Sequence, residues 1–245
     1  MKVCLAGTYA HKEVVGKNLP KFMLESFFYF QDWQIEAIKK CELFLLDSGA
    51  FTFMNNFKGK VDWDEYIKKY ASFINKYDIK YFFELDIDVL VGLDKVKEYR
   101  KELENLTGKK CIPVWHKSRG LDEWIEICKN YDYVAIGGIV IKEIKRKDYP
   151  YFIPLLNIAK KYGTKVHGLG LTCTGELKKY PFYSVDSTSW TSANRFAQMY
   201  YFNGEAMIGL KKPQNSRLKL DKRIDALDLS YREWLKFQEY AEKYL

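Results

Sequence analysis

The stretch Leu45-Leu46-Asp47-Ser48-Gly49-Ala50-Phe51-Thr52-Phe53 guides the interpretation of the whole chain. An apolar run that begins at Leu43 stops abruptly at the Asp47 carboxylate, and a Ser-Gly turn and an aromatic residue follow. A short apolar run that ends at turn residues is typical of a buried strand. Because the same arrangement recurs along the chain, we expect several strand ends to converge on one pocket. Asp47 is expected to be one of its two principal acids.

Strands and helices are predicted to alternate along the chain. The apolar runs expected to form strands cover residues 3–7, 43–48, 81–86, 111–116, 133–138, 165–171, 182–186 and 205–210. The stretches expected to form helices cover residues 63–76, 93–106, 121–130, 151–162, 176–180, 193–201 and 231–244. Residues 21–40 are expected to form helix or loop over one end of the sheet.

Repeated strand–helix units imply a parallel sheet. Eight candidate strands in 245 residues predict an α/β fold, a (β/α)8 TIM-type barrel that forms a single domain over residues 1–245. A doubly wound open sheet is the alternative. Such a sheet usually carries a glycine-rich first turn, and the stretch Gly7-Thr8-Tyr9-Ala10-His11 lacks the GxGxxG pattern of a dinucleotide site.

Composition narrows the classes of function. Hydrophobic residues make up 47% of the chain and aromatic residues 17%, which is enough for a substantial core. No apolar run approaches the roughly 20 residues of a membrane span, so the expected location is the cytoplasm. The five cysteines are odd in number and none stands at a CxxC spacing, which argues against a disulfide framework or a zinc site. The net charge of +8 favours a polyanionic partner such as nucleic acid, and the alternative is a lysine-rich solvated surface.

Polar residues stand at the predicted strand ends, where barrel enzymes place their active sites. Three of these residues are carboxylates: Asp47, Asp86 and Asp186. Other strand ends carry histidines and glycines, namely His116, Gly137-Gly138 and His167-Gly168-Leu169-Gly170. Facing carboxylates push their pKa values apart, and two such groups can cleave a bond at an anomeric carbon. The histidines and aspartates could instead bind a divalent metal, as in amidohydrolase-type barrels, although the HxH signature of those sites is missing.

These residues resemble the motifs of the tRNA-guanine transglycosylases and of their phage relatives, the DNA 7-deazaguanine transglycosylases. The resemblance covers residues 43–195, and the motifs follow one another in the family's order. The DSGGFQ-type motif of the family is similar to Asp47-Ser48-Gly49-Ala50-Phe51-Thr52. The remaining motifs are similar to Leu85-Asp86-Ile87, Val114-Trp115-His116, Ala135-Ile136-Gly137-Gly138-Ile139, Gly168-Leu169-Gly170-Leu171 and Val185-Asp186-Ser187-Thr188 followed by Arg195.

The resemblance implies a role for each motif and needs neither a cofactor nor a metal. Asp186 would be the nucleophile that displaces guanine and holds the sugar, and Asp47 would be the general acid/base. Asp86 would accept hydrogen bonds from the purine, while Gly137 and Gly138 would let backbone amides approach the base. The other residues expected to bind the base are Ser48, Phe51, His116 and Gly170, with Tyr9 as an alternative stacking partner to Phe51.

Departures from the family's pattern bear on the substrate. A cysteine-rich zinc site after the barrel is missing, Thr52 stands where the motif has glutamine, and His116 or Trp115 replaces the pocket glutamine. These departures favour exchange of guanine in DNA for a free 7-deazaguanine such as preQ0 in a host cytoplasm, with tRNA as the alternative substrate. A metal-assisted barrel hydrolase and a non-catalytic nucleic-acid-binding barrel are the rival functions. The residues expected to bind phosphates are Arg195, Lys142, Lys145, Arg146, Lys211, Lys212 and Arg217.

Overall fold

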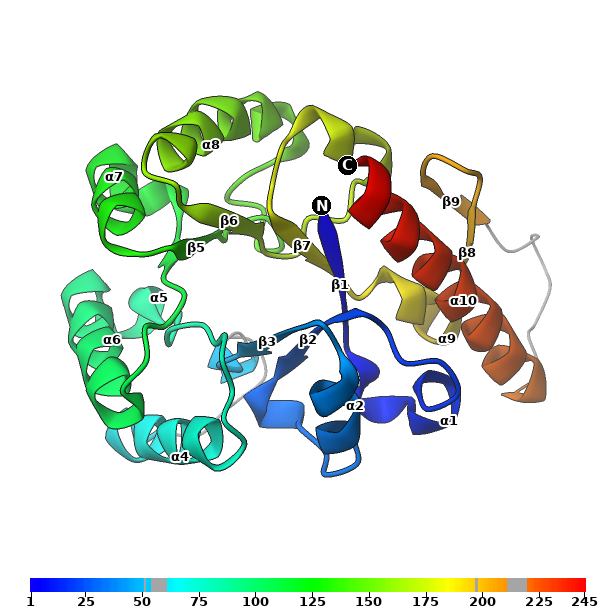
Figure 1. Cartoon of the computed structure of the whole chain (residues 1–245), viewed down its shortest axis with the longest axis horizontal. Helices are drawn as coiled ribbons and strands as arrows, with labels where there is room; N and C mark the ends of the chain where they lie inside the picture. Colours follow the sequence, from blue (N-terminus) through cyan, green and yellow to red (C-terminus); the bar gives the residue numbers. More distant parts are fainter. Residues whose placement is uncertain (51, 54–60, 197, 211–219) are drawn as a thin grey trace.

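A curled parallel sheet surrounded by helices forms the protein (Figure 1). The computed structural model describes residues 1–50, 52–53, 61–196, 198–210 and 220–245, with the side chains of 194, 195 and 220–223 left out. Seven strands pair in the order β3-β2-β1-β7-β6-β5-β4, and all of these pairs are parallel. Their bounds are β1 (Lys2–Ala6), β2 (Phe22–Ser26), β3 (Leu43–Asp47), β4 (Val114–Trp115), β5 (Tyr133–Ile136), β6 (Lys165–Gly168) and β7 (Ser184–Ser187).

Helices follow most strands and cover the outer side of the sheet (Figure 1). Their amphipathic spacing explains this position, because one face of each helix carries the buried residues. The α-helices are α1 (Lys12–Val15), α2 (Gln34–Lys40), α4 (Trp63–Lys76), α5 (Asp88–Val91), α6 (Leu93–Thr107), α7 (Gly120–Asn130), α8 (Phe152–Lys161), α9 (Ser192–Phe196) and α10 (Leu220–Tyr244). Short 3-10 helices cover Thr8–Ala10, Phe27–Tyr29, Lys117–Arg119, Arg146–Tyr151, Thr174–Lys179 and Ser189–Thr191.

The two edges of the sheet approach each other through residues 82–83. Leu46 of β3 forms a parallel bridge with Phe82, and Phe83 forms one with Ile112, just before β4. The Phe83 amide donates to the Leu46 carbonyl oxygen at 2.9 Å. Side chains from these segments meet inside the curled sheet in one apolar cluster, which contains Cys4, Ala6, Phe22, Leu24, Leu43, Leu45, Phe83, Ile112, Val114, Tyr133 and Ala135. The predicted α/β class and parallel sheet are therefore confirmed, in a TIM-like arrangement.

Several predicted elements differ from the structure, in whole or in part. Residues 22–26 form β2 in the middle of the sheet, whereas we expected helix or loop there. This strand is buried on both faces, so its sequence, which runs from Phe22 to Ser26, does not show the alternation of a half-exposed strand. Residues 207–210 form β9, which pairs antiparallel with β8 (Met199–Phe202) in a separate sheet and is not the eighth barrel strand. The helix expected over 193–201 accordingly ends at Phe196.

The C-terminal helix α10 covers the end of the sheet where β1 and β2 begin. The Gln238 amide donates to the carbonyl oxygens of Val3 at 2.7 Å and Phe22 at 3.0 Å, and its own oxygen accepts from the Lys21 amide at 2.8 Å. The terminal amine of Met1 donates to the Ala241 carbonyl at 2.9 Å. This helix therefore covers the amino ends of β1 and β2, opposite the carboxyl ends where the acids lie. No helix among the described residues is long and apolar enough to cross a lipid bilayer.

Candidate active site

Three carboxylates meet at the carboxyl ends of the strands, as the sequence predicts. Asp47 is the last residue of β3, Asp186 lies in β7, and Asp86 follows the bridging residues 82–83. Burial is the main cause of the raised pKa of Asp47, and the negative charges of Asp86 and Asp186 add to it, so the three groups share one electrostatic environment. The parallel arrangement of the strands explains this convergence, because every carboxyl end points to the same side of the sheet.

Asp47 is held by the turn that follows it. The Gly49 amide donates to Asp47 Oδ2 at 2.9 Å, and Gly49 has a φ of +79°. A Cβ on Gly49 would lie 2.7 Å from the Cβ of Phe28, so this turn requires glycine. Burial raises the pKa of Asp47 to about 6, the Gly49 amide opposes the rise, and the two neighbouring aspartates add to it. Asp47 can therefore exchange a proton close to neutral pH.

Ser48 offers an unused polar group beside Asp47. Its carbonyl oxygen accepts a hydrogen bond from the Tyr66 hydroxyl at 2.5 Å. Its own Oγ is buried and has no hydrogen-bond partner among the described residues. An unsatisfied buried hydroxyl of this kind is uncommon in a folded protein. Phe51, the expected stacking residue, lies outside the described residues.

Asp186 is fixed through one of its two oxygens. Its Oδ1 accepts from the Gly170 amide at 2.6 Å and lies 3.2 Å from Nε2 of His167. Gly170 has a φ of +69°, and a Cβ there would lie 2.3 Å from Cγ2 of Val140, so this position also requires glycine. The predicted Gly170 is thus brought to the site, where it contacts Asp186 directly.

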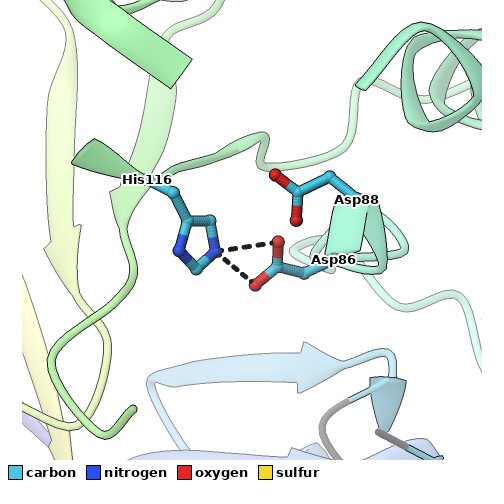
Figure 2. A group of neighbouring side chains, drawn as sticks. All are labelled: Asp86, Asp88 and His116. Carbon is cyan, nitrogen blue, oxygen red and sulfur yellow. Dashed lines mark hydrogen bonds and ion pairs between the residues drawn. The ribbon is translucent and has the colours of Figure 1, made fainter. Parts of the chain in front are cut away.

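His116 lies between two carboxylates. Its Nε2 is 2.8 Å from Asp86 Oδ2, and its Nδ1 is 3.1 Å from Oε2 of Glu143, a residue in the loop after β5. Burial alone would lower the pKa of His116, but the hydrogen bonds and charges of Asp86 and Glu143 outweigh burial and raise this pKa to about 9. Figure 2 shows the imidazole ring directed at Asp86, with Asp88 beside it. We infer that His116 carries a positive charge at neutral pH and pairs with Asp86.

The glycine pair after β5 leaves room for these side chains. A Cβ on Gly137 would lie 2.9 Å from the His116 ring, and one on Gly138 would lie 2.8 Å from Oε2 of Glu143. The Gly137 amide donates to the Trp115 carbonyl at 2.8 Å as part of the sheet. We expected a base to lie beside Gly137, but the ring of His116 occupies that space.

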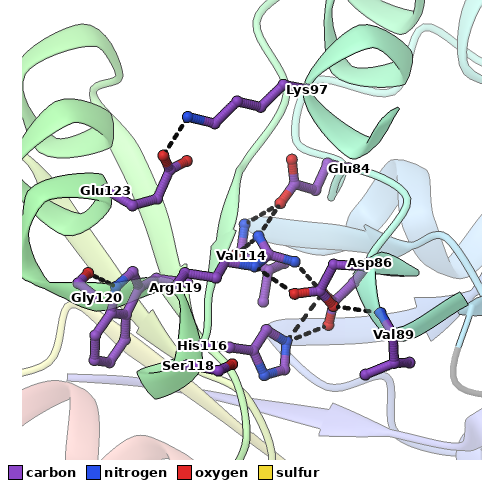
Figure 3. A network of polar contacts seen from close by, with 12 residues as sticks. Glu84, Asp86, Val89, Lys97, Val114, His116, Ser118, Arg119, Gly120 and Glu123 are labelled. Atoms are coloured by element: carbon purple, nitrogen blue, oxygen red, sulfur yellow. Dashed lines mark hydrogen bonds and ion pairs between the residues drawn. The ribbon is translucent and has the colours of Figure 1, made fainter. Parts of the chain in front are cut away.

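A buried arginine joins the acids of this region, and the sequence did not predict it. Arg119 contacts Glu84 at 3.0 Å, Asp86 at 2.9 Å and Asp88 at 2.9 Å, and only 2% of its side chain is exposed. Figure 3 shows how this guanidinium lies among the carboxylates. Arg100 adds a second ion pair to Glu84 at 2.6 Å. The acids stand at every second position, 84, 86 and 88, and this alternation is the signal that sequence reasoning could have used.

One group of side chains has the composition of a metal site. Ligand atoms of Asp86, Asp88 and His116 lie within 4.8 Å of one another, and carboxylate and imidazole donors suit several divalent ions. Arg119 already binds both aspartates, and His116 already binds Asp86. A cation would therefore have to displace the guanidinium before it could use these ligands.

The basic residues expected to bind phosphates are described only in part. Lys142, Lys145 and Arg146 are exposed in or just after the loop that follows β5. Arg146 pairs with Glu176 at 2.6 Å, which neutralises part of its charge. The side chain of Arg195, and the residues Lys211, Lys212 and Arg217, lie outside the described part of the chain.

Comparisons with known proteins give one viral relative and no family. No protein-family model matches the sequence. The chain is 26% identical over 234 residues to "Uncharacterized protein 306" of Sulfolobus islandicus rod-shaped virus 1, an alignment that covers 81% of this chain and 74% of the viral protein. The relative's name states no activity, so the chemistry must be argued from the residues themselves.

Proposed function

We propose that the protein is a base-exchange glycosyltransferase that replaces guanine in nucleic acid by a 7-deazaguanine such as preQ0. The observation that carries this proposal is the pairing of two unlike carboxylates. Asp47 has a pKa of about 6, and the charge of Asp186 reaches it. Asp186 Oδ1 accepts from the Gly170 amide and lies 3.2 Å from Nε2 of His167. Carboxyl groups in such different surroundings serve as a proton donor and a nucleophile in glycosyl transfer.

The exchange needs only these two groups and the two bases. Asp186 Oδ2 attacks C1′ and forms a C–O bond as the C1′–N9 bond breaks, and the electron pair leaves on the guanine. Asp47 gives its proton to this guanine and becomes a carboxylate. The incoming base then loses its N9 proton to Asp47 and attacks C1′, which releases Asp186. Protons and electrons balance, so neither water nor a cofactor is consumed.

Recognition of the base is assigned to Asp86 and Ser48. Asp86 pairs with His116 and Arg119 mainly through Oδ1, so its Oδ2, which lies 2.8 Å from Nε2 of His116, keeps a lone pair for a further donor. A charged acceptor complements the N1–H and amino group of guanine and of its 7-deaza analogues. Ser48 is assigned to the base as well, because its buried Oγ lacks a hydrogen-bond partner among the described residues.

DNA is the proposed nucleic acid, because the chain lacks a cysteine-rich zinc site like that of the tRNA enzymes. A base inside a duplex must be turned out before C1′ becomes accessible to a buried carboxylate. Lys142 and Lys145 are exposed in the loop that follows β5, where they are suited to contact phosphates.

We further propose that residues 82–83 serve as the eighth strand of a complete (β/α)8 barrel. Their parallel bridges to Leu46 and Ile112 support this, since those residues belong to the two edges of the seven-stranded sheet or adjoin them. The apolar cluster that includes Phe83 and side chains of five neighbouring strands supports it too. A complete barrel would place the three aspartates around one mouth.

The test is an exchange assay with labelled preQ0 or guanine and either DNA or tRNA. Wild-type protein should incorporate the label, and Asp186→Ala should abolish both incorporation and any covalent protein–nucleic-acid adduct. Asp122→Asn, an exposed acid on α7, is the matched control and should exchange normally. Full activity of Asp186→Ala would refute the mechanism. Salt-dependent DNA binding without exchange, unchanged in Asp47→Asn, would support a non-catalytic binding protein instead.

The group Asp86, Asp88 and His116 favours a second candidate, a metal-assisted hydrolase of a small molecule. This function predicts stoichiometric zinc or manganese in the purified protein, bound through these three side chains. Metal analysis of the wild type and of His116→Ala separates the two functions. Metal that is present in the wild type and lost in the variant would favour the hydrolase.

A further inference from the structure

A chain of buried polar groups runs behind Asp186 through the interior of the sheet. His167 of β6 is fully buried, and its Nε2 lies 3.2 Å from Asp186 Oδ1. Its Nδ1 lies 2.6 Å from the Ser184 hydroxyl of β7. The Ser184 hydroxyl in turn makes a short hydrogen bond with the Tyr133 hydroxyl of β5. Three adjacent strands therefore contribute to one line of contacts that ends on the proposed nucleophile.

The direction of the hydrogen bonds follows from what each group can donate. An ionised Asp186 only accepts, so Nε2 of His167 must carry a proton. When the ring carries this single proton, its Nδ1 accepts the hydroxyl proton of Ser184, and the Ser184 oxygen accepts the proton of Tyr133. Burial raises the pKa of Tyr133 well above its usual value, so this phenol keeps its proton. Each proton along this line of hydrogen bonds thus has one acceptor, and the corresponding tautomer of His167 carries its proton on Nε2.

We infer that His167 is a positioning residue for the nucleophile, and that Ser184 and Tyr133 set its tautomer; this inference rests on the proposed base exchange. His167 and the Gly170 amide both donate to Oδ1 of Asp186, which leaves Oδ2 as the attacking atom. When Oδ2 forms its bond to C1′, Oδ1 becomes the carbonyl oxygen of the ester and keeps both donors. When the incoming base breaks that bond, the same donors stabilise the returning carboxylate charge.

The geometry of these hydrogen bonds excludes the assignment of the same residues as a hydrolytic triad. Serine, histidine and aspartate in hydrogen-bonded order are the components of a hydrolytic triad. Here the Ser184 side chain is fully buried between Tyr133 and His167. A serine in that position cannot meet a substrate, whereas Asp186 lies at the end of its strand with part of its surface exposed. The hydrogen bonds from Tyr133 through Ser184 and His167 therefore position Asp186.

Two amide substitutions of His167 separate its two contacts. In His167→Gln the side-chain amide can occupy the place of Nε2 and still donate to Asp186, whereas the shorter amide of His167→Asn occupies the place of Nδ1 and does not reach it. We expect single-turnover exchange to fall about 100-fold in His167→Asn and less than about 10-fold in His167→Gln, with the KM for the free base unchanged in both. His11→Asn is the control, because His11 packs on Trp190 and its pKa is lowered by burial alone, with no contribution from a neighbouring acid.

A spectroscopic measurement tests the same contact without any activity. The ¹⁵N shifts of His167 in the wild type should show a proton on Nε2 and none on Nδ1, and Ser184→Ala, which removes the donor to Nδ1, should shift the Nδ1 resonance while the proton stays on Nε2. A proton on Nδ1 in the wild type, or equal losses of rate in His167→Asn and His167→Gln at equal thermal stability, would overturn the inference. If the wild type exchanges no base, the proposed function fails, and the ¹⁵N shifts still decide whether His167 donates to Asp186.

Discussion

Asp47 and Asp186 occupy similar places at the ends of two strands, and their neighbours make them different. Asp47 is buried and lies among other negative charges, so its pKa rises to about 6 although the Gly49 amide opposes this rise. Asp186 receives an amide and an imidazole on the same oxygen. Each acid depends on a glycine with positive φ, Gly49 or Gly170, whose amide reaches the carboxylate. Two residues of the same type thereby acquire different chemistry.

Glu25 of β2 provides a test of buried charge outside the proposed chemistry. Burial raises its pKa from 4.5 to about 7, although the Thr8 amide donates to it at 2.7 Å. The fold thus favours the protonated form, so stability is greatest below about pH 4.5 for this group and is lost as the pH rises through 7. We expect Glu25→Gln to gain up to about 3 kcal/mol over the wild type at pH 8 and little at pH 4.5.

Urea unfolding at the two pH values measures this difference. Glu13→Gln, an exposed change of the same kind on α1, is the control and should leave the unfolding free energy unchanged within about 0.5 kcal/mol. An equal effect of Glu25→Gln at both pH values would mean that Glu25 does not titrate differently in the folded and unfolded chain.

At the residue scale, the sequence predicted the acids better than their partners. Asp47, Asp86 and Asp186 could be identified because each follows an apolar run at a strand end. Arg119 lies 35 residues from Glu84 along the chain, and only the folded sheet brings the two together. No local pattern encodes such a contact, so the ion-pair network remained hidden.

At the scale of elements, local signals decided which predictions were accurate. The helix α4 begins after Asp62, whose side chain accepts from the Glu65 amide at 3.0 Å, and α6 ends at Gly108 with a φ of +66°. Caps and helical spacing of this kind are visible in the sequence. The strand β2 has no such marker, because both of its faces are buried. Pairing of β9 with β8 depends on a distant partner surface, which the sequence pattern does not reveal.

The loop after β5 is predicted to contribute to the binding of DNA. Lys142 and Lys145 are exposed there, close in sequence to Glu143, whose carboxylate contacts His116. We expect Lys142→Glu combined with Lys145→Glu to weaken binding of duplex DNA at low salt at least about 10-fold. The slope of log affinity against log salt should fall by about 2, because each phosphate contact contributes about 1.

Fluorescence anisotropy over a series of salt concentrations measures both quantities. The matched control is Lys160→Glu with Lys161→Glu at the end of α8, which makes the same charge change just before β6 begins. These lysines lie at the opposite end of the strands from the acids. Equal effects of the two double variants would show that net charge, and not this loop, governs DNA binding.

For the molecule as a whole, the segment around residues 82–86 joins the two sheet edges with few backbone hydrogen bonds. Ion pairs add to this link, since Glu84 is fully buried and contacts both Arg100 and Arg119. The alternation of strands and helices was enough to predict the parallel sheet. The joining of the edges was not predictable in detail, because single bridges and buried charges leave no periodic signal in a sequence.

Removal of one cation should show how much this network contributes. Arg119→Met leaves Glu84, Asp86 and Asp88 without a shared partner, and we expect a loss of about 3 to 5 kcal/mol in unfolding free energy. Arg232→Met removes an ion pair on the exposed side of α10 and should cost less than about 1 kcal/mol. Urea unfolding compares the two variants, and similar losses would show that the buried network contributes no more than a surface pair.

The helix α10 has a consequence for how the chain is made. Gln238 binds the backbone of Val3, 235 residues earlier in the sequence. At about 5 to 20 residues per second, a ribosome needs at least roughly ten seconds to connect the two. During that time the amino ends of β1 and β2 lack the helix that covers them in the folded protein. Nascent chains should therefore be most sensitive to proteases and most dependent on chaperones until the last turns of α10 have left the ribosome.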